Sequence, residues 1–396
     1  MPARAHQTGR ADVAAPLPAA GPLVFVAAHE PSGDAHAASL IRAVRSQSPE
    51  VRFAGVAGPA MQAEGCWPIF DMSRHSAMLL GVVRAVPAAL KLLASTSRHL
   101  RRYPFSAAVV VDSPTLNLPI ALRAKRAGLP VLYFIAPQLW AWGESRMNRL
   151  RARVDRMAVI LPFEEAYFQA QGIDARYVGH PLFDRLAAHP PDPALVASIR
   201  AKGQPVVAVL PGSRRHVVEE VFGGQLEVLR QIVRAFPKTH IAVSVANAQV
   251  AGPIRSAIRR SGLSVSTLDR EHNGEMLTAA DLTLVASGTA TLEVAYRGCP
   301  MIVMYNASRL AYELVGRWMI KTRHLCLVNI LAQRELVPEF MPYYRSTEPI
   351  AEQAVALLGD EQARRRMSEA LSGLIEPVIK PGAAENVAEM LINLLE

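Results

Sequence analysis

Short apolar runs rich in β-branched residues alternate with helical segments from residue 23 onward, and this alternation constrains the fold more than any other feature of the chain. It is typical of parallel sheets whose strands are connected by helices. The first half has expected strands at 23–28, 52–58, 107–113, 131–136 and 157–162 and expected helices at 35–47 and 117–128. The second half has expected strands at 205–213, 239–247, 281–287 and 300–305 and expected helices at 352–375 and 383–396.

A proline-rich stretch, HPPDP at 189–193, separates the two series. A chain of 396 residues is also too long for one hydrophobic core. We therefore expect an α/β protein with two Rossmann-like domains that face a central cleft. The expected parts are a flexible tail at 1–21, a first domain at 22–188, a second domain at 204–372, and a helix within 373–396 that packs back on the first domain.

Charge, cysteine content and hydropathy limit the classes of function that the chain can have. The formal net charge of +9 and the pI near 9.7 favour an anionic partner such as phosphate, nucleic acid or an acidic membrane surface. Three cysteines without a C-x-x-C pair argue for a reducing compartment and against a disulfide framework. The longest uncharged run, 127–143, is broken by prolines and too short to span a membrane. No D-x-D clamp or nucleic-acid module is evident, so we expect no metal, no cofactor and no nucleic-acid partner.

A strand-to-helix corner within ASGTATLE, residues 286–293, combines small residues with one acid. In an open parallel sheet, ligands bind beyond the carboxyl ends of the strands, where the first N–H groups of a helix attract anions. Small side chains would let a pyrophosphate approach this backbone, and the acid would accept hydrogen bonds from ribose hydroxyls. An ordinary capped helix is the alternative. The candidate ligands are Ser287, Gly288, Thr289, Ala290, Thr291 and Glu293.

The loop LPGSRR, residues 210–215, forms a second corner of the same kind. The strand ends in Gly212 and Ser213, and Arg214 opens the next helix. Arginine suits bidentate phosphate recognition and can neutralise charge on a leaving group. A turn with solvated arginines is the alternative. Both loops belong to one expected domain and would face the same cleft, so together they favour a nucleotide diphosphate.

Two loops of the first half also follow expected strands. Asp112 comes after the apolar run 109–111 and is a candidate general base at the carboxyl end of a buried strand. The alternative is an acid that caps the helix beginning near Asn117. The loop 29–36 makes a similar corner after the first strand, in which Gly33 permits an unusual backbone angle.

The stretch 77–95 is too apolar for a solvated helix face. Core packing is the usual explanation, and an apolar surface that dips into an anionic membrane is the alternative. We expect core packing for most of the stretch and membrane contact for part of it. The residues expected at the membrane are Met78, Leu79, Leu80, Val82, Val83, Val86 and Leu90.

Taken in order, these segments resemble one family, the lipid-A-disaccharide synthases, which are inverting glycosyltransferases of the GT-B fold. The resemblance runs from about residue 23 to residue 340 and rests on the order and spacing of many motifs. The motifs are EPSGD (30–34), GVAGPAMQAEGC (55–66), DSPTLN (112–117), PQLWAW (137–142), LPFEEAYF (161–168), VGHPLFD (178–184), LPGSRR (210–215), ASGTATLE (286–293) and NILAQRELVPE (329–339).

The resemblance implies a metal-independent condensation of UDP-2,3-diacylglucosamine with 2,3-diacylglucosamine 1-phosphate, which gives the β-1,6 disaccharide and UDP. Asp112 matches the family's proposed base. The implied UDP ligands are Gly212, Ser213, Arg214, Asn329, the corner residues 287–291 and Glu293, and the implied acceptor-side residues are Glu30, Ser32, Gly33, Asp34 and Asn117. The acylated substrates imply a peripheral position on the anionic cytoplasmic face of the inner membrane. A homodimer is a further expectation.

The chain departs from the family pattern at three positions. His29 stands where the family usually has Gly, Thr115 where it has a second acid, and Val328 where a proline usually precedes the Asn of the last motif. The first two departures lie on the acceptor side. The donor-side motifs match the family pattern more closely. The alternatives are another GT-B UDP-sugar enzyme, such as a UDP-N-acetylglucosamine 2-epimerase or a peptidoglycan N-acetylglucosaminyl transferase, and a non-catalytic nucleotide- or membrane-binding relative.

Overall fold

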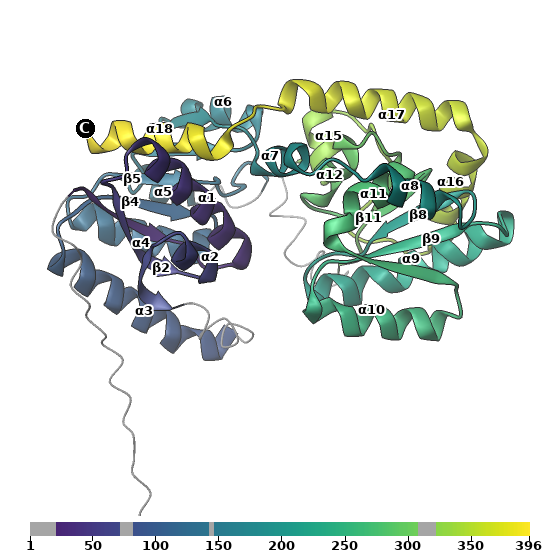
Figure 1. The fold of residues 1–396 in the computed structure, drawn as a ribbon, viewed down its shortest axis with the longest axis horizontal. Helices are drawn as coiled ribbons and strands as arrows, with labels where there is room; N and C mark the ends of the chain where they lie inside the picture. The colour runs from purple at the N-terminus through teal and green to yellow at the C-terminus, as the bar shows by residue number, and fades with distance from the viewer. Residues whose placement is uncertain (1–20, 72–81, 142–145, 308–321) are drawn as a thin grey trace, which may run out of the picture.

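The computed structural model describes residues 21–71, 82–141, 146–307 and 322–396, and it contains two parallel sheets with helices packed against them (Figure 1). This confirms the expected α/β class. The first sheet has the order β3-β2-β1-β4-β5-β6-β7. Its strands are β1 Leu23–Ala27, β2 Arg52–Ala57, β3 Trp67–Asp71, β4 Phe105–Val111, β5 Val131–Phe134, β6 Arg156–Val159 and β7 Asp174–Tyr177.

The second sheet has the order β10-β9-β8-β11-β12-β13. Its strands are β8 Val206–Leu210, β9 His240–Val245, β10 Val265–Asp269, β11 Leu282–Ala286, β12 Met301–Met304 and β13 Glu339–Phe340. The central strands β1, β8 and β11 are buried along their whole length, as expected where helices cover both faces of a parallel sheet.

The helices follow the strands in the order expected for crossover connections. In the first half they are α1 Pro31–Gln47, α2 Pro59–Ala63, α3 Val82–Arg102, α4 Pro114–Arg126, α5 Met147–Arg151, α6 Pro162–Ala170 and α7 Pro181–Ala188. In the second half they are α8 Pro193–Arg200, α9 Arg215–Ala235, α10 Ala248–Ser261, α11 Asn273–Ala279, α12 Ala290–Tyr296, α15 Leu327–Ala332, α16 Glu348–Gly359, α17 Glu361–Ile375 and α18 Ala383–Leu395.

Proline sets the start of several helices and explains why two of them begin earlier than predicted. Helix α1 starts at Pro31 and not at residue 35, and α4 starts at Pro114 and not at residue 117. Proline is favoured in the first helical turn because its fixed φ suits the helix and its missing N–H would have no partner there. The prolines therefore bring each helix close to the end of the strand before it.

Other sequence-based boundaries were wrong for local reasons. The helix predicted at 352–375 is two helices, α16 and α17, because Asp360 leaves the helical conformation and its Oδ1 accepts a hydrogen bond from the N–H of Ala363 at 2.9 Å. Strands β3, β7, β10 and β13 were not predicted. Three of them, β3, β7 and β10, carry partly exposed residues near or at an edge of their sheet, so they lack a continuous apolar run.

Helix α18 returns from the end of the chain to the first sheet. In Figure 1, α17 lies over the second sheet and α18 lies beside α1 on the first. Val387, Ala388 and Leu391 are fully buried in the same apolar cluster as α1. The carboxylate of Asp184 in α7 accepts hydrogen bonds from the N–H groups of Gly382 and Ala383, at 2.9 and 2.8 Å. The last helix is thus anchored at its first residue and along its apolar face.

Each sheet has one point at which the strand order reverses. In the first sheet it lies between β1 and β4, and in the second between β8 and β11. Loops that leave two neighbouring strands in opposite directions open a crevice at such a point, which is the usual ligand site of an open α/β sheet. Among the helices of the described segments, none has the length and apolar character needed to cross a membrane.

Candidate active site

The reversal point of the first sheet carries Glu30 and Asp112. Glu30 follows β1 and Asp112 follows β4, and these strands are hydrogen-bonded neighbours with Ala27 paired to Val110. Glu30 is exposed, whereas Asp112 is partly buried. The fold therefore brings together two carboxylates that lie far apart in the sequence.

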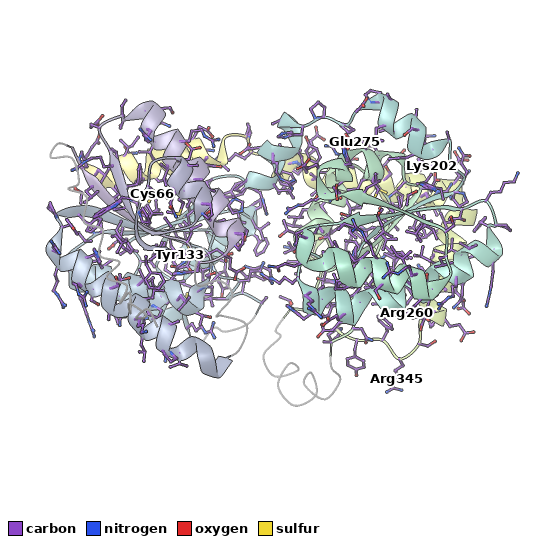
Figure 2. All side chains as sticks on the ribbon, turned by 60° about the horizontal axis from the view of Figure 1, so that its bottom comes forward. Cys66, Tyr133, Lys202, Arg260, Glu275 and Arg345 are labelled. Atoms are coloured by element: carbon purple, nitrogen blue, oxygen red, sulfur yellow. The ribbon has the colours of Figure 1, made fainter. Side chains whose placement is uncertain are left out.

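Asp112 has an uncommon backbone conformation. Its φ is +53° and that of Ser113 is +42°, so two consecutive non-glycine residues are left-handed. Such conformations cost about 1–3 kcal/mol each and cluster at functional sites. The Asp112 carbonyl accepts hydrogen bonds from the Tyr133 hydroxyl at 2.8 Å and from Asn117 Nδ2 at 2.6 Å, which hold this turn in place. Figure 2 shows Tyr133 in the interior of the first unit, where it is fully buried.

The reversal point of the second sheet carries both predicted phosphate loops. Gly212 and Ser213 follow β8, and Ser287 and Gly288 follow its neighbour β11. Gly212 has φ +114°, and a Cβ there would lie 2.7 Å from Cγ1 of Val217, so glycine is needed at this turn. Ser213 and Arg214 are exposed beside it.

The corner after β11 is open in front of Gly288. Its φ is +129°, a conformation that favours glycine, and a Cβ built there would meet no atom within 4 Å among the described residues. The Thr291 N–H donates to the Gly288 carbonyl at 3.1 Å, and the N–H groups before it lie outside the helical hydrogen-bond ladder. The corner thus places backbone N–H groups outside the helical ladder beside space that no described residue fills.

Glu293 lies behind this corner and is 5% exposed. The guanidinium of Arg185, in α7, lies 3.8 Å from its Oε2. Burial lowers the pKa of Arg185, and Glu293 opposes that shift. The sequence did not single out Arg185, although it directly follows the VGHPLFD motif.

A hydrogen-bonded ion pair joins the two reversal points. Arg214 Nη2 donates to Glu30 Oε2 at 3.1 Å, and Ser113 Oγ donates to Glu30 Oε1 at 3.4 Å. Burial raises the pKa of Asp112, and the negative charge of Glu30 raises it further. The N–H of Ser113 and the charge of Arg214 lower it. Asp112 and Arg214 therefore belong to one electrostatic site, although they lie on different sheets.

Four of the residues predicted as ligands have side chains that form hydrogen bonds within the chain. Asp34 is buried and accepts hydrogen bonds from Gly58, Ala60 and Met61 N–H groups, which fixes the start of α2. Asn117 is fully buried and holds the Asp112 turn. The polar atoms of these two side chains are occupied within the chain, by backbone groups and, for Asn117 Oδ1, by the His29 ring.

Two residues of the second unit are engaged in the same way. Thr291 is fully buried, and its hydroxyl donates to the Gly288 carbonyl at 2.9 Å. Asn329 is fully buried, and its Oδ1 accepts hydrogen bonds from the N–H groups of Leu336 and Val337. Its Nδ2 donates to the Val337 carbonyl and to Glu339. Asn329 therefore fixes a turn, and both polar atoms of its side chain are engaged in hydrogen bonds.

The remaining acceptor-side residues differ in access. Ser32 is exposed in the first turn of α1, whereas Gly33 is buried with its Cα facing Ala28 and the Val111 carbonyl. Gly33 lies in α1 without a positive φ, so the expected unusual backbone angle is absent, and it offers no side chain to a ligand.

The structure also identifies Asn247 as a residue that the sequence analysis missed. It follows β9, and its Nδ2 donates to the Ser213 carbonyl at 2.9 Å while its Oδ1 caps α10. An Asn after a strand and before a helix is a recognisable N-cap signal. Its contact with the Ser213 loop is tertiary and has no local signature.

The predicted membrane segment is partly described. Met78, Leu79 and Leu80 lie outside the described residues, and Val82 and Val83 belong to α3 without described side chains. Val86 and Leu90 are exposed, at 53% and 62%, whereas Leu92 is buried. Within the described part of the chain, no cluster of three His, Cys, Asp or Glu side chains could hold a metal ion.

The two facing α/β units define a GT-B protein, the fold class of many glycosyltransferases and of related epimerases. A putative UDP-N-acetylglucosamine 2-epimerase from Listeria monocytogenes has this fold, with a TM-score of 0.63, 13% identity and coverage of 94% of this chain and 95% of that chain. The UDP-N-acetylglucosamine 2-epimerase from Neisseria meningitidis, solved with UDP-GlcNAc, gives a TM-score of 0.56 at 10% identity, with coverage of 94% and 98%.

Sequence similarity gives the family. A family model described as lipid-A-disaccharide synthetase matches residues 24–389. The lipid-A-disaccharide synthase of Syntrophus aciditrophicus is 35% identical over 376 residues, which cover 94% of this chain and 98% of that protein. The chain belongs to the lipid-A-disaccharide synthase family, and it is a glycosyltransferase of lipid A biosynthesis.

Proposed function

We propose that the chain transfers the sugar of UDP-2,3-diacylglucosamine to the 6-hydroxyl of 2,3-diacylglucosamine 1-phosphate. The products are the β-1,6-linked lipid A disaccharide 1-phosphate and UDP. The family assignment supports this reaction, and the UDP-GlcNAc in the Neisseria neighbour supports a UDP-sugar donor. The epimerase alternative rests on fold alone, at 10–13% identity.

In this reaction Asp112 acts as the general base. Its carboxylate takes the proton of the acceptor 6-hydroxyl as that oxygen bonds to the anomeric carbon of the donor. The bond from this carbon to the UDP oxygen breaks on the opposite face, so the anomeric configuration inverts. The raised pKa of Asp112 makes its carboxylate a stronger base than an exposed aspartate, which aids proton transfer near neutral pH.

The second reversal point receives the charge that UDP gains as it leaves. Arg214 is the charged group, and the Gly212–Ser213 turn and the N–H groups of the corner at 287–290 are the neutral donors. Glu293 accepts hydrogen bonds from the ribose, and Arg185 orients its carboxylate. These groups need no metal to stabilise the diphosphate.

The observation that carries the proposal is the contact between Arg214 and Glu30. Glu30 contacts Arg214 and also Ser113, the residue after Asp112. Through Glu30, the proposed cation for the leaving group therefore lies near the proposed base of the other sheet. A sugar donor held by Arg214 would therefore present its anomeric carbon near Asp112.

We further propose that residues 22–188 form the acceptor domain, that 204–372 form the donor domain, and that 373–396 complete the first. The packing of α18 against α1 supports the last assignment. Exposed Val86 and Leu90 on α3, next to exposed Lys91, support peripheral binding to the anionic cytoplasmic face of the inner membrane. A homodimer remains a prediction.

The test is release of UDP from the two acylated substrates in detergent without added metal. We expect turnover in the wild type, near-complete loss in Asp112→Asn, and unchanged UDP affinity in that variant. No UDP release by the wild type would count against the synthase reaction, and UDP binding without turnover would indicate a non-catalytic relative. Turnover of a water-soluble acceptor, or epimerisation without an acceptor, would identify one of the other GT-B enzymes.

A further inference from the structure

The side-chain amide of Asn117 has a fixed orientation. Its Nδ2 donates to the carbonyls of Val111 and Asp112, at 2.7 and 2.6 Å, and these two bonds use both of its hydrogens. The reversed amide would place its oxygen against two carbonyl oxygens, which have no hydrogen to donate. The Oδ1 atom of Asn117 must therefore be the acceptor in its remaining contact.

That remaining contact is with His29, two residues after β1. The Nε2 atom of His29 lies 2.9 Å from Asn117 Oδ1. Because Oδ1 can only accept, Nε2 carries a proton and donates it. The register of β1 on β4, with Ala27 beside Val110, brings His29 next to Asp112 at the ends of the two strands.

The His29 ring is buried at 7% exposure, and its Nδ1 atom has no hydrogen-bond partner among the described residues. Burial lowers the pKa of His29 to about 4, so the ring is neutral near pH 7 and carries one proton. A buried nitrogen without a partner costs stability, which an apolar side chain of similar size would avoid. The hydrogen bond from Nε2 to Asn117 is the contact that only the polar ring provides.

We infer that His29 is a positioning residue for the glycosyl transfer. Its Nε2–H group locks the Asn117 amide, and this amide holds the left-handed turn that presents the Asp112 carboxylate to the acceptor hydroxyl. The Tyr133 hydroxyl supplies a second hydrogen bond to the same carbonyl from β5. The inference rests on the proposed role of Asp112 as the base.

Two substitutions of similar size separate this role from simple packing. Glutamine at position 29 can put an amide N–H group where Nε2 lies, whereas the shorter asparagine can reach only the place of Nδ1. We expect His29→Gln to keep kcat within about threefold of the wild type. We expect His29→Asn to lower kcat by roughly 10- to 100-fold, the size of effect that a misplaced catalytic group produces. The KM for the donor should stay within about twofold in both, because the donor loops lie on the other sheet.

Two further measurements test whether His29 acts through Asp112. Both variants are compared by thermal unfolding, and we expect a lower midpoint only for His29→Asn, because it leaves the buried Asn117 Oδ1 without its donor. The two substitutions are then repeated in the Asp112→Asn background, where His29→Asn should cause no further loss of residual turnover. Equal kcat values for the two variants, or an undiminished effect of His29→Asn in that background, would overturn the positioning role alone. Normal turnover by Asp112→Asn itself would overturn the base assignment and, with it, the role of His29.

Discussion

Arg214 and Glu30 form a hydrogen-bonded ion pair between the two sheets, with 3.1 Å between Nη2 and Oε2. Both side chains are largely exposed, at 66% and 46%, so the pair itself adds little to stability. The position of the pair matters more than its energy. The Glu30 carboxylate is bound to the same guanidinium that, in the proposed function, binds the diphosphate of UDP. Glu30 and UDP would therefore compete for Arg214.

This competition predicts that removal of the Glu30 charge strengthens UDP binding. Glu30→Gln should lower the Kd for UDP by roughly two- to fivefold, because exposed ion pairs contribute up to about 1 kcal/mol. Calorimetric titration of UDP at low salt measures the change, and Glu64→Gln, which breaks an ion pair with Arg42 remote from the crevice, is the matched control. Weaker binding in Glu30→Gln would mean that Glu30 helps to hold the nucleotide.

Arg214 has a matched neighbour in Arg215. Arg214→Lys should weaken UDP binding about tenfold, because lysine keeps the charge but loses the planar fork that binds phosphate. Arg215→Lys should change the Kd by less than about twofold, because its guanidinium pairs with Glu219 one helical turn away on the exposed side of α9. Equal losses in the two variants would contradict a specific role for Arg214.

The charges around Asp112 predict the pH dependence of turnover. The base must be ionised, and its pKa is raised, so kcat/KM should fall as the pH drops through a value above the ordinary aspartate pKa of about 3.9. Glu30→Gln should move this acid limb to lower pH, because Glu30 raises the Asp112 pKa. Arg214→Gln should move it to higher pH, because Arg214 lowers that pKa. Steady-state assays across pH 4–8 in the three proteins test the signs, and a shift opposite to either would refute this account of the site.

Exposed apolar side chains on α3 predict membrane binding. Val86→Ser combined with Leu90→Ser should weaken binding to vesicles of anionic lipid at least tenfold, since full burial of each side chain is worth roughly 1.5–3 kcal/mol and about 1.4 kcal/mol is a tenfold change. The control is Ile379→Ser, which removes an exposed apolar residue, 41% exposed, from the segment before α18. Sedimentation with vesicles measures the binding, and an equal loss in the control would show that general surface hydrophobicity is responsible.

The packing of α18 predicts a large effect on stability far from the site. Leu391 is fully buried against the first sheet, so Leu391→Ala should lower the free energy of unfolding by about 2–5 kcal/mol. Asn393→Ala, at an exposed position of the same helix, should have an effect below about 0.5 kcal/mol. Urea unfolding followed by circular dichroism compares the two, and a small loss in Leu391→Ala would mean that α18 is not anchored to the first sheet.

Local patterns predicted the central strands well, because strands such as β1 and β8 are fully buried apolar runs. They also located Asp112, Arg214 and the corner at Gly288, since each follows such a strand. The short outer strands β3 and β7 were not predicted, because partly exposed residues interrupt their apolar pattern.

The roles of buried polar residues could not be predicted in this way. Asp34 and Asn329 belong to motifs that point to a ligand, yet their partners are backbone groups and, for Asn329, also the Glu339 carboxylate. The partners of Asp34, at Gly58 and Met61, are brought near only by the completed fold. The contact of His29 with Asn117 spans 88 positions, and its direction follows from hydrogen-bond geometry that no spacing in the sequence encodes.

The return of α18 to the first sheet also affects the order in which the two units can fold during synthesis. The face of β1 and β4 next to α1 stays incomplete until residues 383–395 leave the ribosome, by which time the second sheet has already emerged. The second unit can therefore close its core first, and the amino-terminal unit is the last to mature. A nascent chain that stalls before residue 383 would leave this apolar face open to chaperones or to aggregation.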